Sequence, residues 1–336
     1  MIKIPEELTK NKPQRAEYYS DALKWLDKQY EDAKKKRIEY TLNTPIEKRM
    51  EDFKKQLGFP LWNNPEKNEI NVKSEILAED EKFTAYDMQL EVLEGVHLYG
   101  IYFKPKTEKK NLPFVILQHG GAGVPEIVSG LIPSDNYNNF GRDLIESGYC
   151  VFAPQLMLWY EDRFGSPYNK EAFDIAMKQL GGSKTAFEVY CLTRAIDYFE
   201  TLPEIDPNRI GMAGLSYGGM YTLITAAAEP RIKVAVSSCF VNDRRQYAWS
   251  DWSYVDQANT FFDPEVMTLI SPRHLFVELG TKDALFDQKN YGMIKSEYEY
   301  YKEKLNLPDN CTIHLFEGEH EFARDEKNLE FIKKYL

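Results

Sequence analysis

The spacing of hydrophobic positions changes along the chain and divides it into two regions. In residues 1–74 apolar side chains recur at helical spacing among charged ones, so the pattern predicts one or two amphipathic helices over 15–40. A further helix is predicted from Pro45 to Leu57, because Gly58 follows as a helix-ending residue. We expect this N-terminal helical extension to pack on the flank of the main domain; the alternative is that it borders a cleft or contacts another subunit.

Residues 75–336 are predicted to form the main domain. Its first element is an antiparallel hairpin, since 83–92 and 96–103 alternate polar and apolar residues around a turn. Short apolar runs then indicate buried strands at 114–118, 149–154, 210–215, 232–237, 274–279 and 311–316, and helical patterns cover 139–147, 183–202, 220–228 and 326–335. Strands that alternate with helices predict an α/β fold with a doubly wound, mostly parallel sheet.

One block, residues 241–270, interrupts this alternation with aromatic side chains that follow no clear period. It comes after a strand that ends near Cys239, at the carboxyl end of a parallel strand, where such sheets bind ligands. We interpret it as an aromatic-rich insertion that is either a lid facing the substrate or a loop folded onto its own hydrophobic residues. The side chains expected to line the cleft, with a place in the core as the alternative, are Trp159, Tyr160, Trp249 and Trp252.

Ser216 is the candidate nucleophile, because it lies in a G-x-S-x-G pattern between Gly214 and Gly218. An apolar strand-like run precedes it and a helix-forming run follows, which is the setting of a nucleophile elbow. Glycines are needed beside a serine in so tight a turn, because a Cβ would collide with neighbouring backbone. The N-terminus of the following helix favours negative charge that develops next to the serine.

His320 is the candidate base, which a serine hydroxyl needs at neutral pH. Of the five histidines, His97, His274 and His314 fall within predicted strands. His119 leads a glycine cluster, where we expect it to brace the loop. His320 follows the last strand and precedes the last helix, and the chain order Ser, acid, His puts the base there.

Asp283 is the favoured acid, because it lies closest to the end of the strand that precedes it. Asp287 is the alternative, and Asp251 would have to reach over from the aromatic block. An acid at this place holds the imidazole in the correct tautomer and stabilises the imidazolium.

Two backbone amides are expected to form the oxyanion hole. One belongs to Tyr217, directly after the nucleophile, and the other to the glycine cluster, at Gly121 with Ala122 as the alternative. The cluster lacks the lysine and the spacing of a phosphate-binding loop. His119 and His320, with the glutamates beside His320, also fall short of a metal-ligand pattern, so we expect no metal and no cofactor.

The net charge and the cysteine content limit the kinds of partner and the compartment that we expect. A net charge of −11 argues against nucleic acid or an anionic membrane surface. No apolar run approaches a membrane span and the first residues are polar, so we expect a cytoplasmic protein without a signal peptide. The scattered cysteines, Cys150, Cys191, Cys239 and Cys311, fit reduced and mostly buried thiols. A homo-oligomer is left open.

The motifs HGGAG, GLSYGG, GTKDALF and EGEHEF occur in this order, and with them residues 75–336 resemble the α/β-hydrolase family. The antiparallel lead, Pro-Asn-Arg-Ile-Gly before the elbow and Ser-Pro-Arg-His before the acid strand look like bacterial serine esterases of the dienelactone-hydrolase and acetyl-xylan-esterase types. This resemblance implies a carboxylic-ester hydrolase, including deacetylases of sugars or xenobiotics. True dienelactone hydrolases have a cysteine where Ser216 stands, so their lactone chemistry and their substrates are not carried over.

Two other functions fit parts of the sequence. A serine peptidase of the prolyl-oligopeptidase type has a similar elbow but usually carries a β-propeller, which 74 mostly helical residues cannot form. A hydrolase fold kept only for ligand binding is disfavoured by the intact serine, acid and histidine. The expected function is therefore a serine hydrolase that cleaves small-molecule or carbohydrate esters through an acyl-enzyme.

Overall fold

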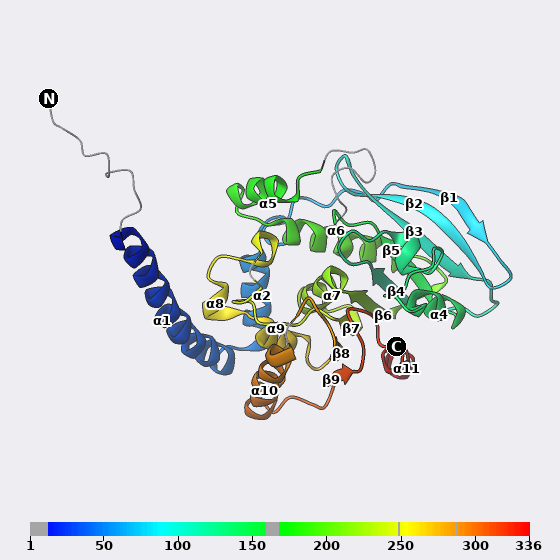
Figure 1. Ribbon diagram of the computed structural model, residues 1–336. Coiled ribbons are helices and arrows are strands. Elements are labelled where there is room, and N and C mark those ends of the chain that lie inside the picture. Colours follow the sequence, from blue (N-terminus) through cyan, green and yellow to red (C-terminus); the bar gives the residue numbers. More distant parts are fainter. Residues whose placement is uncertain (1–12, 159–167, 248, 287) are drawn as a thin grey trace.

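The computed structural model describes residues 13–158, 168–247, 249–286 and 288–336. In these residues nine strands form one sheet in the order β1-β2-β3-β5-β4-β6-β7-β8-β9 (Figure 1). The strands are β1 (Val72–Glu79), β2 (Phe83–Leu93), β3 (Val96–Pro105), β4 (Leu112–Gln118), β5 (Cys150–Pro154), β6 (Ile205–Leu215), β7 (Ile232–Ser238), β8 (His274–Gly280) and β9 (Cys311–Phe316). Pairing is antiparallel from β1 through β3 to β5 and parallel from β5 to β9.

Helices cover both faces of the sheet, as the expected doubly wound fold requires. They are α1 (Pro13–Asn43), α2 (Ile46–Leu57), α3 (Pro125–Val128), α4 (Phe140–Glu146), α5 (Lys170–Gln179), α6 (Lys184–Phe199), α7 (Tyr217–Ala228), α8 (Gln257–Thr260), α9 (Asp263–Ile270), α10 (Gln288–Lys304) and α11 (Lys327–Tyr335). One buried core joins the sheet to α6, α7 and α9 through residues such as Phe199 and Tyr221. A second core, with Leu144 and Ile332, joins the other face to α4 and α11. The predicted α/β fold class is confirmed.

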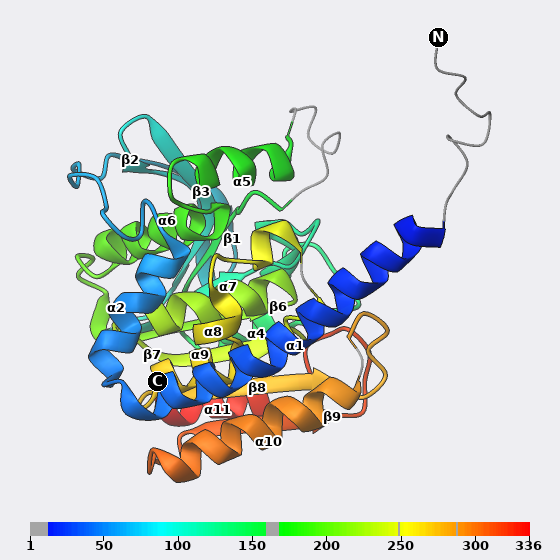
Figure 2. The same ribbon diagram turned by 90° about the vertical axis from the view of Figure 1, so that its left-hand side faces the viewer.

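The two N-terminal helices lie where the sequence predicted them. In α2 the buried Phe53 and Leu57 join the core that contains α6 and α7, and Gly58 ends the helix with a positive φ of 87°. The buried residues of α1 are Ala33, Arg37 and Thr41 in its second half, and the N-terminal part of the helix extends away from the other described elements (Figures 1 and 2).

The sequence pattern missed several elements. Strand β1 pairs with β2 at the edge of the sheet, and most of its side chains are exposed. Its sequence therefore lacks the hydrophobic pattern that a buried strand shows. Helices α5 and α10 were not predicted. In the block 241–270 the last eight residues form α9, which is fully buried and packs against α7 and α10. That part of the block is therefore a crossover helix, and the rest of the block consists of loop segments and the short helix α8. Within the described residues, no helix combines the length and the apolar character that crossing a membrane requires.

The parallel strands end together at one edge of the sheet. Gln118 of β4 pairs with Gly214 of β6, and Leu215 pairs with Ser238 of β7. Gly280 of β8 pairs with Phe316 of β9. The loops that follow these strands therefore meet at one edge, which is where ligands bind in open α/β sheets.

Candidate active site

Ser216 stands in a sharp turn between β6 and α7, with φ 61° and ψ −122°. This left-handed backbone is costly for a residue with a Cβ and persists only where surrounding structure enforces it. Here neighbouring backbone packs closely around the turn. A Cβ on Gly218 would lie 2.2 Å from the Gln118 carbonyl oxygen, and one on Gly214 would lie 2.4 Å from the Gly218 backbone. The Ser216 amide also donates to the Ser238 carbonyl at 2.9 Å. The turn has the geometry expected of a nucleophile elbow.

His320 and Asp283 are joined by a hydrogen bond of 2.7 Å between Nδ1 and Oδ2. Because a carboxylate only accepts, Nδ1 is the donor and Nε2 is free to accept a proton. The other carboxylate oxygen, Oδ1, accepts from the backbone N–H groups of Leu285 at 2.8 Å and Phe286 at 3.4 Å. The Nε2 atom of His320 is buried and has no hydrogen-bond partner among the described residues. The pair is oriented as a base with its supporting acid.

Ser216 and His320 line the same cavity, which has a volume of about 600 Å³. Trp249 and Trp252, both predicted to face the cleft, line it as well. Their rings lie 4.3 Å apart, and Trp252 is buried while Trp249 is 52% exposed. The other two predicted cleft residues, Trp159 and Tyr160, lie outside the described residues. Further lining side chains that the sequence did not indicate are Asn136, Tyr137, Leu158, Tyr168, Lys170, Tyr247, Leu285 and Phe286.

The two residues expected to supply the amides of an oxyanion hole lie next to each other. A Cβ on Gly121 would touch the Tyr217 ring at 3.3 Å, and both residues line the cavity. Tyr217 is the first residue of α7, so its N–H has no partner within the helix. The N–H of Ala122, the alternative donor, is used in a 2.7 Å hydrogen bond to the Leu158 carbonyl. The geometry thus favours Gly121 over Ala122.

His119 braces the glycine loop, as the sequence predicted. Its Nδ1 lies 2.8 Å from the Gly120 carbonyl oxygen. Its Nε2 accepts from the backbone N–H of Leu156 at 3.2 Å. The loop is tied from the other side as well, since the Gly120 N–H donates to the Tyr137 hydroxyl at 2.8 Å. These bonds fix the backbone that carries Gly121.

A lysine in the cavity wall was missed by the sequence reading. Lys170 Nζ donates to the Tyr217 hydroxyl at 2.6 Å and to Asp251 Oδ1 at 3.3 Å. Burial, followed by the charge of Asp251, raises the pKa of the Tyr217 phenol, so the hydroxyl stays protonated. Asp251 was considered as a distant candidate for the catalytic acid. Its carboxylate instead accepts hydrogen bonds from Lys170 and from the Tyr217 hydroxyl in the cavity wall. Asp251 therefore does not take the place of the catalytic acid.

Glu278 lies buried beneath the loop that carries His320. Its Oε1 accepts from the Ala323 N–H at 3.1 Å, and both of its carboxylate oxygens accept from Asn328 Nδ2 at 3.0 Å. Burial raises the pKa of the Glu278 carboxyl to about 7. The side chain therefore ties β8 to the loop between β9 and α11.

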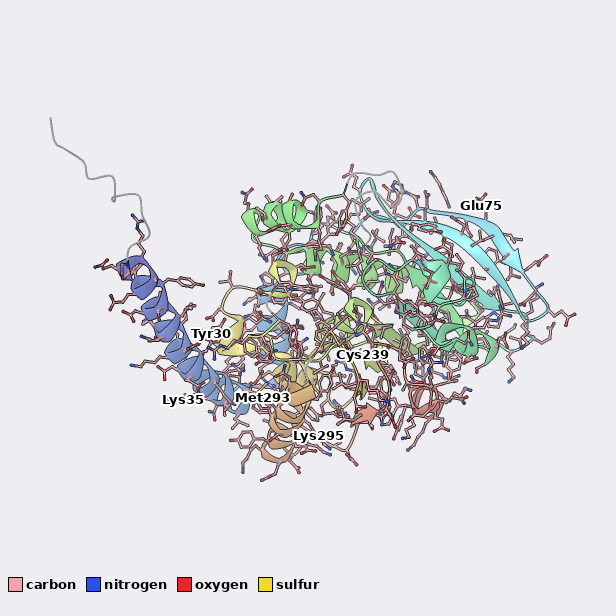
Figure 3. The ribbon with its side chains drawn as sticks, in the orientation of Figure 1. Tyr30, Lys35, Glu75, Cys239, Met293 and Lys295 are labelled. Atoms are coloured by element: carbon pink, nitrogen blue, oxygen red, sulfur yellow. The ribbon has the colours of Figure 1, made fainter. Side chains whose placement is uncertain are left out.

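A thiol lies next to the acid and the base. Within the described part of the chain, the ligand atoms of Cys239, Asp283 and His320 lie within 4.8 Å of one another, deep in the molecule, where Figure 3 labels the cysteine. Metal ligation needs the thiolate, but burial, followed by the nearby Asp283 charge, raises the pKa of Cys239 to about 12. A thiol that keeps its proton is a poor metal ligand, so the arrangement suits an imidazole held by an acid better than it suits metal binding.

The doubly wound sheet, the elbow serine and the cavity at the carboxyl ends of the strands define an α/β hydrolase. Residues 100–334 match the model of the Dienelactone hydrolase family, and the chain belongs to this family. It is accordingly a carboxylic-ester hydrolase.

Individual relatives agree with this assignment. The protein YtaP of Bacillus subtilis is 29% identical over 259 residues, which cover 73% of this chain and 85% of that protein. A glucuronoyl esterase from Solibacter usitatus superposes with a TM-score of 0.62 at 15% identity, over 87% of this chain and 92% of the other. Acetyl xylan esterase 1 from Thermoanaerobacterium gives 0.56 at 16% identity, over 87% and 94% of the two chains. At these identities the two structures show a shared fold.

Proposed function

We propose that this chain hydrolyses small carboxylic esters through an acyl-enzyme formed on Ser216, with His320 as the base and Asp283 as the acid that orients it. One observation supports this proposal above the others. Ser216 and His320 line the same cavity, one buried nitrogen of the His320 imidazole has no hydrogen-bond partner among the described residues, and the other nitrogen is held by Asp283.

The first half of the reaction forms the acyl-enzyme. His320 Nε2 takes the Ser216 proton as the hydroxyl oxygen attacks the ester carbonyl carbon. Asp283 stabilises the resulting imidazolium without taking its proton. The carbonyl oxygen becomes an oxyanion, which the N–H groups of Gly121 and Tyr217 are placed to receive. The imidazolium then gives its proton to the departing alcohol as the C–O bond breaks.

The second half releases the acid. His320 removes a proton from water, whose oxygen attacks the acyl carbon, and the same two amides hold the second oxyanion. Collapse of this intermediate breaks the bond to Ser216, and the imidazolium returns the proton to the serine oxygen. Helix α7 contributes to both halves, because its N-terminal dipole favours the negative charge that develops beside its first residue.

The cavity suits an ester with an apolar or amphipathic body. Its volume of about 600 Å³ falls in the range of small-molecule sites, about 300–1,000 Å³. Aromatic rings, including Trp249 and Trp252, form much of its lining, and polar groups such as Lys170 and Asn136 are few. We propose acetyl esters of carbohydrates or other small molecules as the substrate class, in line with the carbohydrate esterases among its structural neighbours.

The peptidase alternative has less support. In the described residues before the sheet, the chain consists of helices α1 and α2 and a connecting segment, which leaves no β-propeller there. None of the described residues that line the cavity belongs to an edge strand of the sheet, to which a peptide backbone would pair.

A hydrolysis screen tests the proposal. Acetyl, butyryl, feruloyl and methyl-uronate esters would be offered beside aminoacyl-naphthylamides, with Ser216→Ala and Cys239→Ser as paired variants. We expect turnover of acetyl esters that Ser216→Ala abolishes and Cys239→Ser retains. Cleavage of the naphthylamides alone would favour a peptidase, and ester turnover that survives Ser216→Ala would exclude the proposed nucleophile.

A further inference from the structure

One charged side chain in the cavity wall has no part in the proposed chemistry. Among the described residues that line the cavity, Lys170 is the one lysine, arginine, aspartate or glutamate. The proposed hydrolysis uses Ser216, His320, Asp283 and two backbone amides, and it gives this lysine no role. An ammonium group in a substrate cavity therefore calls for its own explanation.

The helix that carries Lys170 does not account for a positive charge at this place. Lys170 is the first residue of α5, and the side chain of Asn169 caps the helix by accepting from the Ala172 N–H at 2.8 Å. The N-terminus of a helix already has a partial positive charge, which favours acidic residues in the first turn and disfavours basic ones. A residue that breaks a local rule of this kind is expected at a functional site.

Two neighbouring groups hold the ammonium of Lys170 in the wall. Its Nζ donates to the Tyr217 hydroxyl at 2.6 Å and to Asp251 Oδ1 at 3.3 Å. The Tyr217 hydroxyl in turn donates to Asp251 Oδ2 at 3.2 Å. An ammonium has three N–H groups, and within the described residues these bonds use two of them. The third remains for an oxygen atom of a molecule in the cavity.

The charge of Lys170 is already balanced, which favours an uncharged oxygen as its ligand. Nζ lies 3.3 Å from Asp251 Oδ1 and 3.3 Å from Oδ2, and this aspartate is fully buried. A substrate carboxylate on the cavity side of the ammonium would lie close to the Asp251 carboxylate, and like charges brought together in a binding site repel strongly. The net charge of −11 adds to this repulsion. A hydroxyl group meets neither obstacle.

Tyr217 sets the distance between the ammonium and the reacting carbonyl. Its backbone N–H is one of the two amides proposed to receive the oxyanion, and its hydroxyl contacts Lys170. The ammonium thus lies one tyrosine side chain away from the oxyanion site. An acetyl group has only a methyl beyond its carbonyl carbon, so the part of an acetyl ester that spans this distance is the alcohol.

Aromatic rings flank the ammonium. Nζ lies 5.0 Å from the centre of the Tyr217 ring and 5.5 Å from the centre of the Trp249 ring. A sugar ring has apolar C–H faces and a rim of hydroxyl groups, so it can pack against an aromatic ring while a hydroxyl meets the charged donor. Apolar walls with a few polar groups that fix orientation are the usual composition of a small-molecule site.

We propose that Lys170 selects acetyl esters whose alcohol part carries further hydroxyl groups, as a sugar does, by donating a hydrogen bond to one of them. Asp251 and Tyr217 position the ammonium for this bond. The inference rests on the proposed esterase function and names the residue that determines its substrate class. An alcohol without a hydroxyl leaves the donor unpaired in the complex, which disfavours that ester.

The test compares kcat/KM for two acetyl esters of equal ring size. A mono-O-acetylated methyl xyloside carries free hydroxyl groups, and cyclohexyl acetate carries none. We expect the wild type to prefer the xyloside. Lys170→Met should lower the ratio of the two kcat/KM values about 10- to 100-fold, as expected for one hydrogen bond from a charged donor. Damage to the fold or to the nucleophile lowers both values and leaves their ratio unchanged.

Lys178→Met is the matched control. Lys178 lies on the same helix and pairs with Asp174 at 2.7 Å, and Asp174 is as fully buried as Asp251. Lys178 does not belong to the described lining of the cavity, so the control should keep the wild-type ratio. Lys170→Met/Asp251→Asn removes both charges, which avoids a buried aspartate without a partner, and it should lose the ratio as the single variant does.

The outcomes separate this inference from the proposed function. Hydrolysis of both esters through Ser216, with the same ratio in the wild type and in both Lys170 variants, would overturn the assignment of Lys170 alone. A loss confined to 4-acetoxycyclohexanecarboxylate would assign Lys170 to acidic substrates and overturn the choice of a hydroxyl. A wild type that hydrolyses none of these esters would overturn the inference together with the proposed function.

Discussion

Replacing Asp283 with asparagine should hold the imidazole of His320 in the wrong tautomer. The position of Oδ1 accepts two backbone N–H groups, from Leu285 and Phe286. In Asp283→Asn the amide oxygen takes that position, because the amide nitrogen would set its own hydrogens against these donors. The NH₂ group then faces His320 Nδ1 at the place of the present 2.7 Å hydrogen bond. Nδ1 must accept, so Nε2 carries the proton and cannot take another from Ser216.

The expected loss is large because a base is removed while the site stays in place. A carboxylate-to-amide change that fixes the wrong tautomer lowers kcat by about 10⁴-fold in a serine triad. This factor corresponds to about 5.5 kcal/mol in activation free energy, at 1.36 kcal/mol for each tenfold change. The volume and the two backbone hydrogen bonds are retained, so we expect the free energy of unfolding to change by far less.

The assay is the steady-state hydrolysis of 4-nitrophenyl acetate, with unfolding in urea measured in parallel. Asp287→Asn is the matched control, since Asp287 is the other acid that the sequence allowed after β8. The control should keep near wild-type kcat. An Asp283→Asn enzyme within tenfold of wild type, or an equal loss in Asp287→Asn, would refute the assignment of Asp283 as the orienting acid.

Three further outcomes follow from the structure. Burial raises the pKa of Glu278 from 4.5 to about 7, so the folded protein binds this proton more tightly than the unfolded chain. The free energy of unfolding should therefore fall by on the order of 3 kcal/mol as the pH rises from about 4.5 to 7. Urea titrations should show that Glu278→Gln loses this pH dependence. Gly218→Ala puts a Cβ 2.2 Å from the Gln118 carbonyl oxygen, so it should destabilise by at least the ~1–3 kcal/mol of an overpacked core and also lower kcat, and wild-type stability would contradict the elbow geometry. Trp249→Ala removes an exposed ring from the cavity wall and should raise KM about tenfold or less with little change in kcat, as expected for one aromatic contact of about 0.5–1.5 kcal/mol; an unchanged KM for every ester tested would remove Trp249 from the site.

Much of the fold was predictable because its signals are local. Apolar runs such as Cys150–Pro154 are buried at every residue, so the strand reads in the sequence as one continuous apolar stretch. Helix α6 begins at Lys184 because the Ser183 side chain accepts from the Ala186 N–H, and that capping residue is visible in the sequence. Strand β1 left no such signal, since it lies at the exposed edge of the sheet.

The core of the site was predictable for a similar reason. The elbow of Ser216 and the place of His320 after the last strand are fixed by their neighbours in the chain, and the strand order then brings them to one cavity. The wall of the cavity was not predictable. Lys170 meets Tyr217 and Asp251 across long stretches of sequence, and a lysine at the start of a surface helix has no pattern that distinguishes it.

The long N-terminal helix α1 shows a different limit. Its aromatic residues follow the helical period, so the sequence predicted the helix and left its partner open between the flank of the domain, the cleft and another subunit. Local pattern gives the buried face of a helix but not the surface that covers it. The structure shows that the buried residues of α1, Ala33, Arg37 and Thr41, all lie in its second half.

The nucleophile is tested most directly by the mass of a covalent adduct. A fluorophosphonate would be incubated with the wild type, Ser216→Ala and His320→Ala, and the labelled peptide would be sequenced by mass spectrometry. The proposed mechanism predicts one adduct on Ser216 of the wild type, none on Ser216→Ala and much slower labelling of His320→Ala. An unlabelled wild type, or an adduct on another residue, would contradict it.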